Sequence, residues 1–211
     1  MSCSRLFSFR SLSLTRFNPT SNRFASSYRK MGEHIVDRYQ LQPLRSDCVP
    51  WRRQPGQQVL WIGCSDSGCD ELESLGLPSD EIFEYRSLGN MMVDDLSCNT
   101  TLRYALDSLK IRNIVICGHY GCHIANGEVN AGLQKPWSSI LDTLRSTHHH
   151  ALDSLTGNER DRALVELNVL EQVHSLSQSP EAADALQKDQ LNIWGMVYDK
   201  ASKTGYQLVE A

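Results

Sequence analysis

Val59-Leu60-Trp61-Ile62-Gly63-Cys64-Ser65-Asp66-Ser67-Gly68 is the stretch that decides the fold. Its first part is an apolar run with strand-forming residues, and its second part consists of the small and polar residues typical of turns. A short apolar run of this kind indicates a buried strand. In α/β proteins ligands bind at the carboxyl ends of such strands. Cys64 and Asp66 are therefore candidate site residues.

A second apolar run, residues 113–117, ends in the same way, in Gly118-His119-Tyr120-Gly121-Cys122. The two stretches together supply two thiols and one imidazole, which are ligands that zinc prefers. A site with three protein ligands can leave the fourth position of the metal to water. We therefore predict a Zn²⁺ site formed by Cys64, His119 and Cys122.

Apolar runs and helical periodicities alternate along the chain. The pattern predicts strands at 59–64, 81–86, 113–117, 191–198 and 206–209, and helices at 94–110, 136–145, 159–176 and 181–188. Such alternation favours an α/β fold with a mostly parallel β-sheet of about four strands plus an edge strand, flanked by helices. The weakly helical pattern of residues 33–53 predicts an arm of short helices that leads into the domain.

The first 32 residues form a separate segment with six basic side chains and neither Asp nor Glu. A segment rich in Arg and Ser and free of acids is typical of a mitochondrial transit peptide, and Arg23-Phe24-Ala25-Ser26 would suit a cleavage site. The alternative is a disordered basic tail. We expect residues 33–211 to form one domain, located in the mitochondrial matrix if the leader is a transit peptide and in the cytoplasm otherwise.

Charge and cysteine usage limit the partners of this domain. Six of the chain's 21 basic side chains lie in the leader, so residues 33–211 contain 15 basic and all 25 acidic side chains. Their net charge is −10. That balance argues against a nucleic-acid partner. We find no run of about 18 apolar residues that would span a membrane. An odd number of cysteines, seven, does not suit a disulfide framework and favours metal-binding thiolates in a reducing compartment.

Several motifs occur together in a characteristic order. They are Cys64-Ser65-Asp66-Ser67 after an apolar strand, Phe83 to Asn90, Leu102-Arg103-Tyr104-Ala105, Gly118-His119-x-x-Cys122, and a closing turn from Gly195 to Gly205. In this order and spacing, residues 33–209 resemble the β-class carbonic anhydrases, in a fungal-like form.

The resemblance implies a function. In that family two cysteines and one histidine hold zinc, which matches Cys64, His119 and Cys122. The family uses the metal to activate a water that attacks carbon dioxide, giving bicarbonate and a proton. The resemblance assigns Asp66 to accept the hydrogen bond of that nucleophile.

The resemblance also implies a substrate pocket and a partner. It assigns an apolar carbon dioxide pocket to Phe83, Leu88 and, from the partner subunit, Tyr104, with Gln54 as a hydrogen-bond donor. Since the family builds its site across a dimer interface, we expect a homodimer or a higher even oligomer.

Two positions depart from the family pattern. The family has Arg where this chain has Gly68, and that Arg grips the Asp in a charge-assisted bond. Without that Arg, the Coulomb attraction between the Asp66 carboxylate and a nearby dication is on the order of several kcal/mol. We therefore hypothesise that Asp66 can bind zinc as a fourth ligand, which would reduce activity. The family also has Gly-Gly where this chain has His123-Ile124; His123 would crowd the pocket rim or shuttle protons. Arg86 is expected to pair structurally and not to replace the missing Arg.

Two other functions stay open at this point. Cys64, His119, Cys122 and Asp66 could form a closed structural zinc site in a catalytically silent protein. The altered pocket could alternatively serve a lyase or hydrolase that acts on another small heteroallene such as carbon disulfide. The run His148-His149-His150 is expected to be a solvated helix face, because consecutive helical residues point in different directions.

Overall fold

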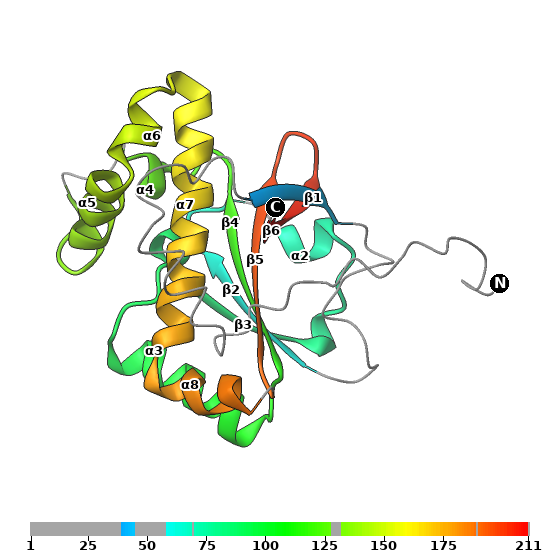
Figure 1. Ribbon diagram of the computed structural model, residues 1–211. Coiled ribbons are helices and arrows are strands. Elements are labelled where there is room, and N and C mark those ends of the chain that lie inside the picture. The colour runs from blue at the N-terminus through cyan, green and yellow to red at the C-terminus, as the bar shows by residue number, and fades with distance from the viewer. Residues whose placement is uncertain (1–38, 45–57, 69, 128–131, 189, 211) are drawn as a thin grey trace.

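A twisted sheet forms the centre of the molecule in the computed structural model, which describes residues 39–44, 58–68, 70–127, 132–188 and 190–210 (Figure 1). Within these residues the sheet has six strands in the order β1-β6-β5-β4-β2-β3. The strands are β1 (Tyr39–Pro43), β2 (Val59–Cys64), β3 (Ile82–Ser87), β4 (Asn113–His119), β5 (Asn192–Asp199) and β6 (Thr204–Glu210). Strands β3, β2, β4 and β5 are mutually parallel, whereas β6 and β1 add antiparallel pairings.

The parallel α/β sheet is confirmed, with one correction at its edge. Residues 39–43 form strand β1, so the expected short helices are wrong for this part of the arm. β1 pairs with β6 from Tyr39 opposite Glu210 to Pro43 opposite Tyr206. Most of β1 is exposed, and its alternation of Tyr39 and Leu41 with Gln40 and Gln42 is too short to predict a strand from the sequence, so the pairing with β6 decides its conformation.

Helices cover the sheet and occur close to where the sequence predicts them. They are α2 (Glu71–Ser74), α3 (Leu96–Arg103), α4 (His123–Asn126), α5 (Trp137–Thr147), α6 (His149–Asp153), α7 (Gly157–Gln178) and α8 (Pro180–Gln187). The helix expected over 94–110 is split, because a π-helical turn at Tyr104–Ser108 follows α3. His149 and His150 are exposed as expected, but His148 is buried between α5 and α6. None of the described helices has the length and apolarity that a bilayer crossing needs.

Helix α7 packs closely against β4 and β5, as Figure 1 shows. The approach depends on glycine: a Cβ added to Gly118 would lie 2.8 Å from Val169 Cγ2 and 3.0 Å from Val165 Cγ1. On β5, a Cβ at Gly195 would lie 3.2 Å from Val169 Cγ1. Because Gly118 directly precedes His119, this contact also fixes the height of the helix above the carboxyl end of β4.

The substitution Gly118→Ala tests this packing. The added methyl group forces a backbone or side-chain shift, so we expect the free energy of unfolding to fall by about 1–3 kcal/mol. Urea unfolding measures the difference. Gly132→Ala is the matched control, since nothing lies within 4 Å of an added Cβ there, and its effect should stay within about 0.5 kcal/mol. Equal stability of the two variants would contradict the close approach.

Candidate metal centre

The three predicted ligands meet at the carboxyl ends of neighbouring strands. Cys64 ends β2, His119 ends β4, and Cys122 follows in the next turn. Because β2 and β4 pair in parallel, their ends lie at the same edge of the sheet. The ligand atoms of Cys64, His119 and Cys122 all lie within 4.8 Å of one another, and all three residues are buried. The described residues therefore contain a preformed cluster of two sulfurs and one imidazole nitrogen.

The geometry of this cluster fits zinc. The two sulfurs, Cys64 Sγ and Cys122 Sγ, are 3.8 Å apart. Two thiolates at about 2.3 Å from one tetrahedral zinc ion would be separated by about 3.8 Å. His119 Nδ1 lies 3.4 Å from the carbonyl oxygen of Tyr120, whereas Nε2 is buried without a hydrogen-bond partner among the described residues. An imidazole held at one nitrogen and left unpaired at the other is typical of a metal ligand.

The two thiols of the cluster affect each other's pKa. The hydrogen bond with Cys122 lowers the pKa of the Cys64 thiol, against the opposing effect of burial, and His119 lowers that pKa further. The same bond and burial raise the pKa of Cys122. The backbone N–H of Asp66 also donates to Cys64 Sγ at 3.2 Å. A bound cation would displace the proton of the bond between the two sulfurs, because cysteine binds metals as the thiolate.

Tyr120 anchors the turn that carries His119 and Cys122. Its hydroxyl donates to Glu166 Oε1 on α7 at 2.6 Å, and its backbone N–H donates to the Tyr198 carbonyl at 3.0 Å. The guanidinium of Arg162 lies 3.5 Å above the Tyr120 ring.

Tyr39 of β1 donates to the other oxygen of the Glu166 carboxylate, Oε2, at 2.8 Å. Burial and Glu166 raise the pKa of both phenols, so both remain donors. Sequence reasoning missed Glu166, whose position among apolar helix residues was its only signal.

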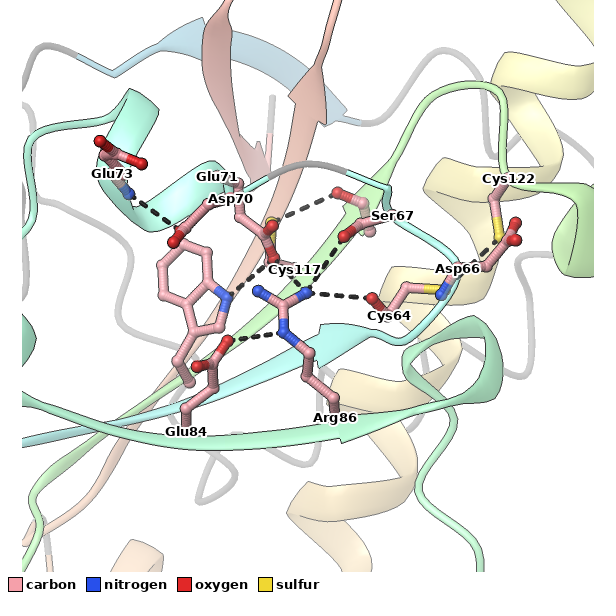
Figure 2. Close-up of polar contacts among 12 residues, drawn as sticks. Cys64, Asp66, Ser67, Asp70, Glu71, Glu73, Glu84, Arg86, Cys117 and Cys122 are labelled. Carbon is pink, nitrogen blue, oxygen red and sulfur yellow. Dashed lines mark hydrogen bonds and ion pairs between the residues drawn. The ribbon is translucent and has the colours of Figure 1, made fainter.

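Arg86 binds the loop that begins at Cys64 (Figure 2). Its Nη1 donates to the Cys64 carbonyl at 3.0 Å and to Ser67 Oγ at 3.2 Å. The same atom lies 3.0 Å from the buried carboxylate of Glu71, and Nε donates to Glu84 Oε1 at 2.6 Å. Arg86 thus pairs structurally, as the sequence analysis expected, and within the described residues none of its bonds goes to Asp66.

Asp66 has a different partner. Its Oδ2 accepts hydrogen bonds from the backbone N–H and from the ring Nδ1 of His123, each at 3.0 Å. Figure 2 shows the Asp66 carboxylate pointing away from Arg86. Asp66 and His123 are far apart in the sequence, and no local pattern indicated this pair.

Gly68, at the position of the missing arginine, has a left-handed backbone with φ +61°. A Cβ added there would meet only Lys200 Nζ at 3.8 Å and the Asp66 carbonyl oxygen at 3.9 Å, which are ordinary contacts. Backbone strain, and not lack of space, therefore limits what can replace this glycine.

The expected pocket residues are partly brought together. The rings of Phe83 and Tyr104 lie 5.7 Å apart in the same chain, at an interplanar angle of 59°. Leu88 and Tyr104 are 39% and 50% exposed, which is unusual for large apolar side chains in this molecule. The expected donor Gln54 lies outside the described residues. Within the described residues, Leu88 and Tyr104 are therefore left partly uncovered.

Zinc titration tests the cluster. We expect one Zn²⁺ per chain, and we expect Cys64→Ser and Cys122→Ser to weaken zinc binding by more than the roughly 10–100-fold seen for residues that only support ligands. Competition with a chromogenic chelator measures the affinity. Cys98→Ala is the matched control, because Cys98 is also a buried free thiol and burial raises its pKa to about 11. An equal loss in Cys98→Ala would contradict the assignment.

Tyr120→Phe tests the anchor on α7. Removing the hydroxyl leaves Glu166 short of one donor, so the free energy of unfolding should fall by about 1–3 kcal/mol. Zinc affinity should fall about tenfold, as for other supporting bonds. Tyr39→Phe removes the other phenol from the same carboxylate without touching the turn. Zinc affinity should therefore survive in Tyr39→Phe, and loss in both variants would show a general effect of Glu166.

Comparison with known sequences identifies the family. The family model described as carbonic anhydrase matches residues 59–205. The carbonic anhydrase of Candida albicans is 35% identical over 159 residues, covering 70% of this chain and 54% of the relative. That of Emericella nidulans is 36% identical over 124 residues, covering 56% and 54%. The chain thus spans about half the length of these curated relatives.

Solved structures agree in fold. Wild-type CafD, a β-carbonic anhydrase of the fungus Aspergillus fumigatus, is 88% identical and superposes with a TM-score of 0.78, covering 81% of this chain and 99% of that one. CafA of the same fungus is 37% identical with a TM-score of 0.65, covering 72% and 74%. With the family model, these matches show that the chain belongs to the β-class carbonic anhydrases of the fungal type.

Proposed function

We propose that the chain is a zinc-dependent carbonate dehydratase, which interconverts carbon dioxide and water with bicarbonate and a proton. The observation that carries this proposal is the buried cluster of Cys64, His119 and Cys122, whose spacing suits a tetrahedral metal. The activity named for its relatives supports it.

The residues present divide the work in a consistent way. Cys64, His119 and Cys122 would hold Zn²⁺, and two thiolates would balance its charge. When bound, the metal would supply Lewis-acid activation of water at neutral pH. Asp66 contributes an acceptor: Oδ2 is held by His123, while Oδ1 makes no hydrogen bond within the described part of the chain. Oδ1 can therefore accept a hydrogen bond from the attacking water and orient its lone pair toward carbon.

Carbon dioxide needs an apolar surface beside this acceptor. Phe83, Leu88 and Tyr104 supply such side chains, and the exposure of Leu88 and Tyr104 leaves them available to a second subunit. We propose a homodimer or a higher even oligomer that covers them. The tetrameric β-carbonic anhydrases of Sordaria macrospora, 25% identical to this chain, support an assembly larger than a monomer.

Gly68 is the reason to propose reduced activity. No guanidinium at this position grips Asp66, whose carboxylate can then compete with water for the metal. The second candidate, a catalytically silent structural zinc protein, is favoured by this same glycine. Action on another small heteroallene such as carbon disulfide would call for a narrow tunnel and stays a prediction. Transit of the chain to mitochondria rests on residues 1–32, outside the described residues, and stays a prediction.

Stopped-flow carbon dioxide hydration on zinc-loaded Gly68→Arg tests the function. We expect the variant to be at least about tenfold faster than the wild type, because a bidentate guanidinium–carboxylate bond stabilises Asp66 away from the metal. The left-handed backbone should reduce its stability by about 1–2 kcal/mol.

Gly68→Ala is the matched control for this experiment, since it carries the same backbone strain without the guanidinium. It should hydrate carbon dioxide no faster than the wild type. If both zinc-loaded proteins, wild type and Gly68→Arg, prove inactive, the structural-zinc function replaces the enzymatic one.

A further inference from the structure

The two departures from the family pattern meet at one side chain. Gly68 removes the arginine expected to grip Asp66, and His123 introduces an imidazole after the last metal ligand. Both donors of His123 converge on Asp66 Oδ2, with the backbone N–H and Nδ1 each 3.0 Å away. The arginine that is absent at position 68 would bind the Asp66 carboxylate, and His123 binds that same carboxylate.

We propose that His123 is the positioning residue that holds the Asp66 carboxylate away from the metal, in place of the missing arginine. The inference rests on the zinc site of the proposed function, but not on catalysis. Glycine at position 123, as in the family pattern, would offer only its backbone N–H. Histidine adds a second donor that approaches the same oxygen.

The arrangement does not need a charged imidazole. A neutral ring with its proton on Nδ1 donates to the carboxylate, and the carboxylate in turn selects that tautomer. His123 directly follows Cys122 and is the first residue of α4, so its backbone donor is fixed relative to the metal ligands. Asp66 is thereby tied to the segment that carries Cys122 instead of to its own loop.

The hydrogen bonds from His123 to Asp66 should be weaker than the bonds that an arginine would make. An imidazole adds one N–H, whereas a guanidinium presents a rigid fork of donors. The His123 side chain is also 58% exposed, so water competes for the bond. Because these bonds are weak, we expect an equilibrium in which Asp66 leaves the fourth coordination position of the metal open part of the time.

Anion binding to the cobalt-substituted full-length protein tests the proposal. Azide can bind Co²⁺ only where Asp66 leaves a coordination position, and the visible spectrum of Co²⁺ reports the binding. We expect His123→Ala to bind azide about tenfold more weakly than the wild type, and His123→Asn, which retains a side-chain donor, to stay within about threefold. His149→Ala is the control for loss of an exposed histidine and should match the wild type.

A double-mutant cycle separates positioning from a structural effect. In the Asp66→Asn background the carboxylate is absent, so His123→Ala should no longer change azide affinity. The proposal is overturned if His123→Ala binds azide like the wild type, if its loss persists in the Asp66→Asn background, or if the cobalt wild type binds no azide. Failure of the chain to bind Co²⁺ at all would instead remove the metal centre, and with it the proposed function.

Discussion

Parallel pairing of β2 with β4 is the constraint on which the site depends. The ladder aligns Ile62 with Ile116, and the two strands then end at Cys64 and His119. Side chains alternate between the faces of a sheet, so a slip of one residue would turn one ligand to the opposite face. The register is held by strands that are buried throughout, where every such slip would also expose or misplace apolar side chains.

Helix α7 converts this register into a complete site. Its apolar face lies on the glycines of β4 and β5, and its polar residues reach two separate segments, the connection between β3 and α3 and the turn after β4. Asn168 Nδ2 donates to the Gly89 carbonyl at 2.7 Å, Gln172 Oε1 accepts from the Met92 N–H at 2.8 Å, and Glu166 holds Tyr120. Buried polar groups are costly unless paired, so these bonds fix the loop conformations as well as the helix. One helix thereby positions both the metal-ligand turn and the segment that bears Leu88.

The sequence was sufficient for features encoded locally. Buried apolar runs predicted the parallel strands, and ligand chemistry together with strand ends predicted Cys64, His119 and Cys122. It was insufficient where pairing over long range decides the outcome. β1 has only a short alternation, Tyr39-Gln40-Leu41-Gln42, and most of it is exposed, so its pairing with β6 and not its own sequence decides its conformation. The contact of His123 with Asp66, and the place of Arg86 beneath the Cys64 loop, depend on how distant segments are brought together, so residue types alone could not indicate them.

Strand β1 determines which backbone groups lie at the edge of the sheet. β6 would be the outermost strand without it, and unpaired N–H and C=O groups along β6 would form a template for another chain. β1 covers those groups while presenting mostly exposed side chains, including Gln40 and Gln42. The bond from Tyr39 to Glu166 fastens one end of this cover to α7. The same carboxylate that steadies the metal-binding turn therefore also fixes the short strand, ending in Pro43, that forms this edge of the sheet.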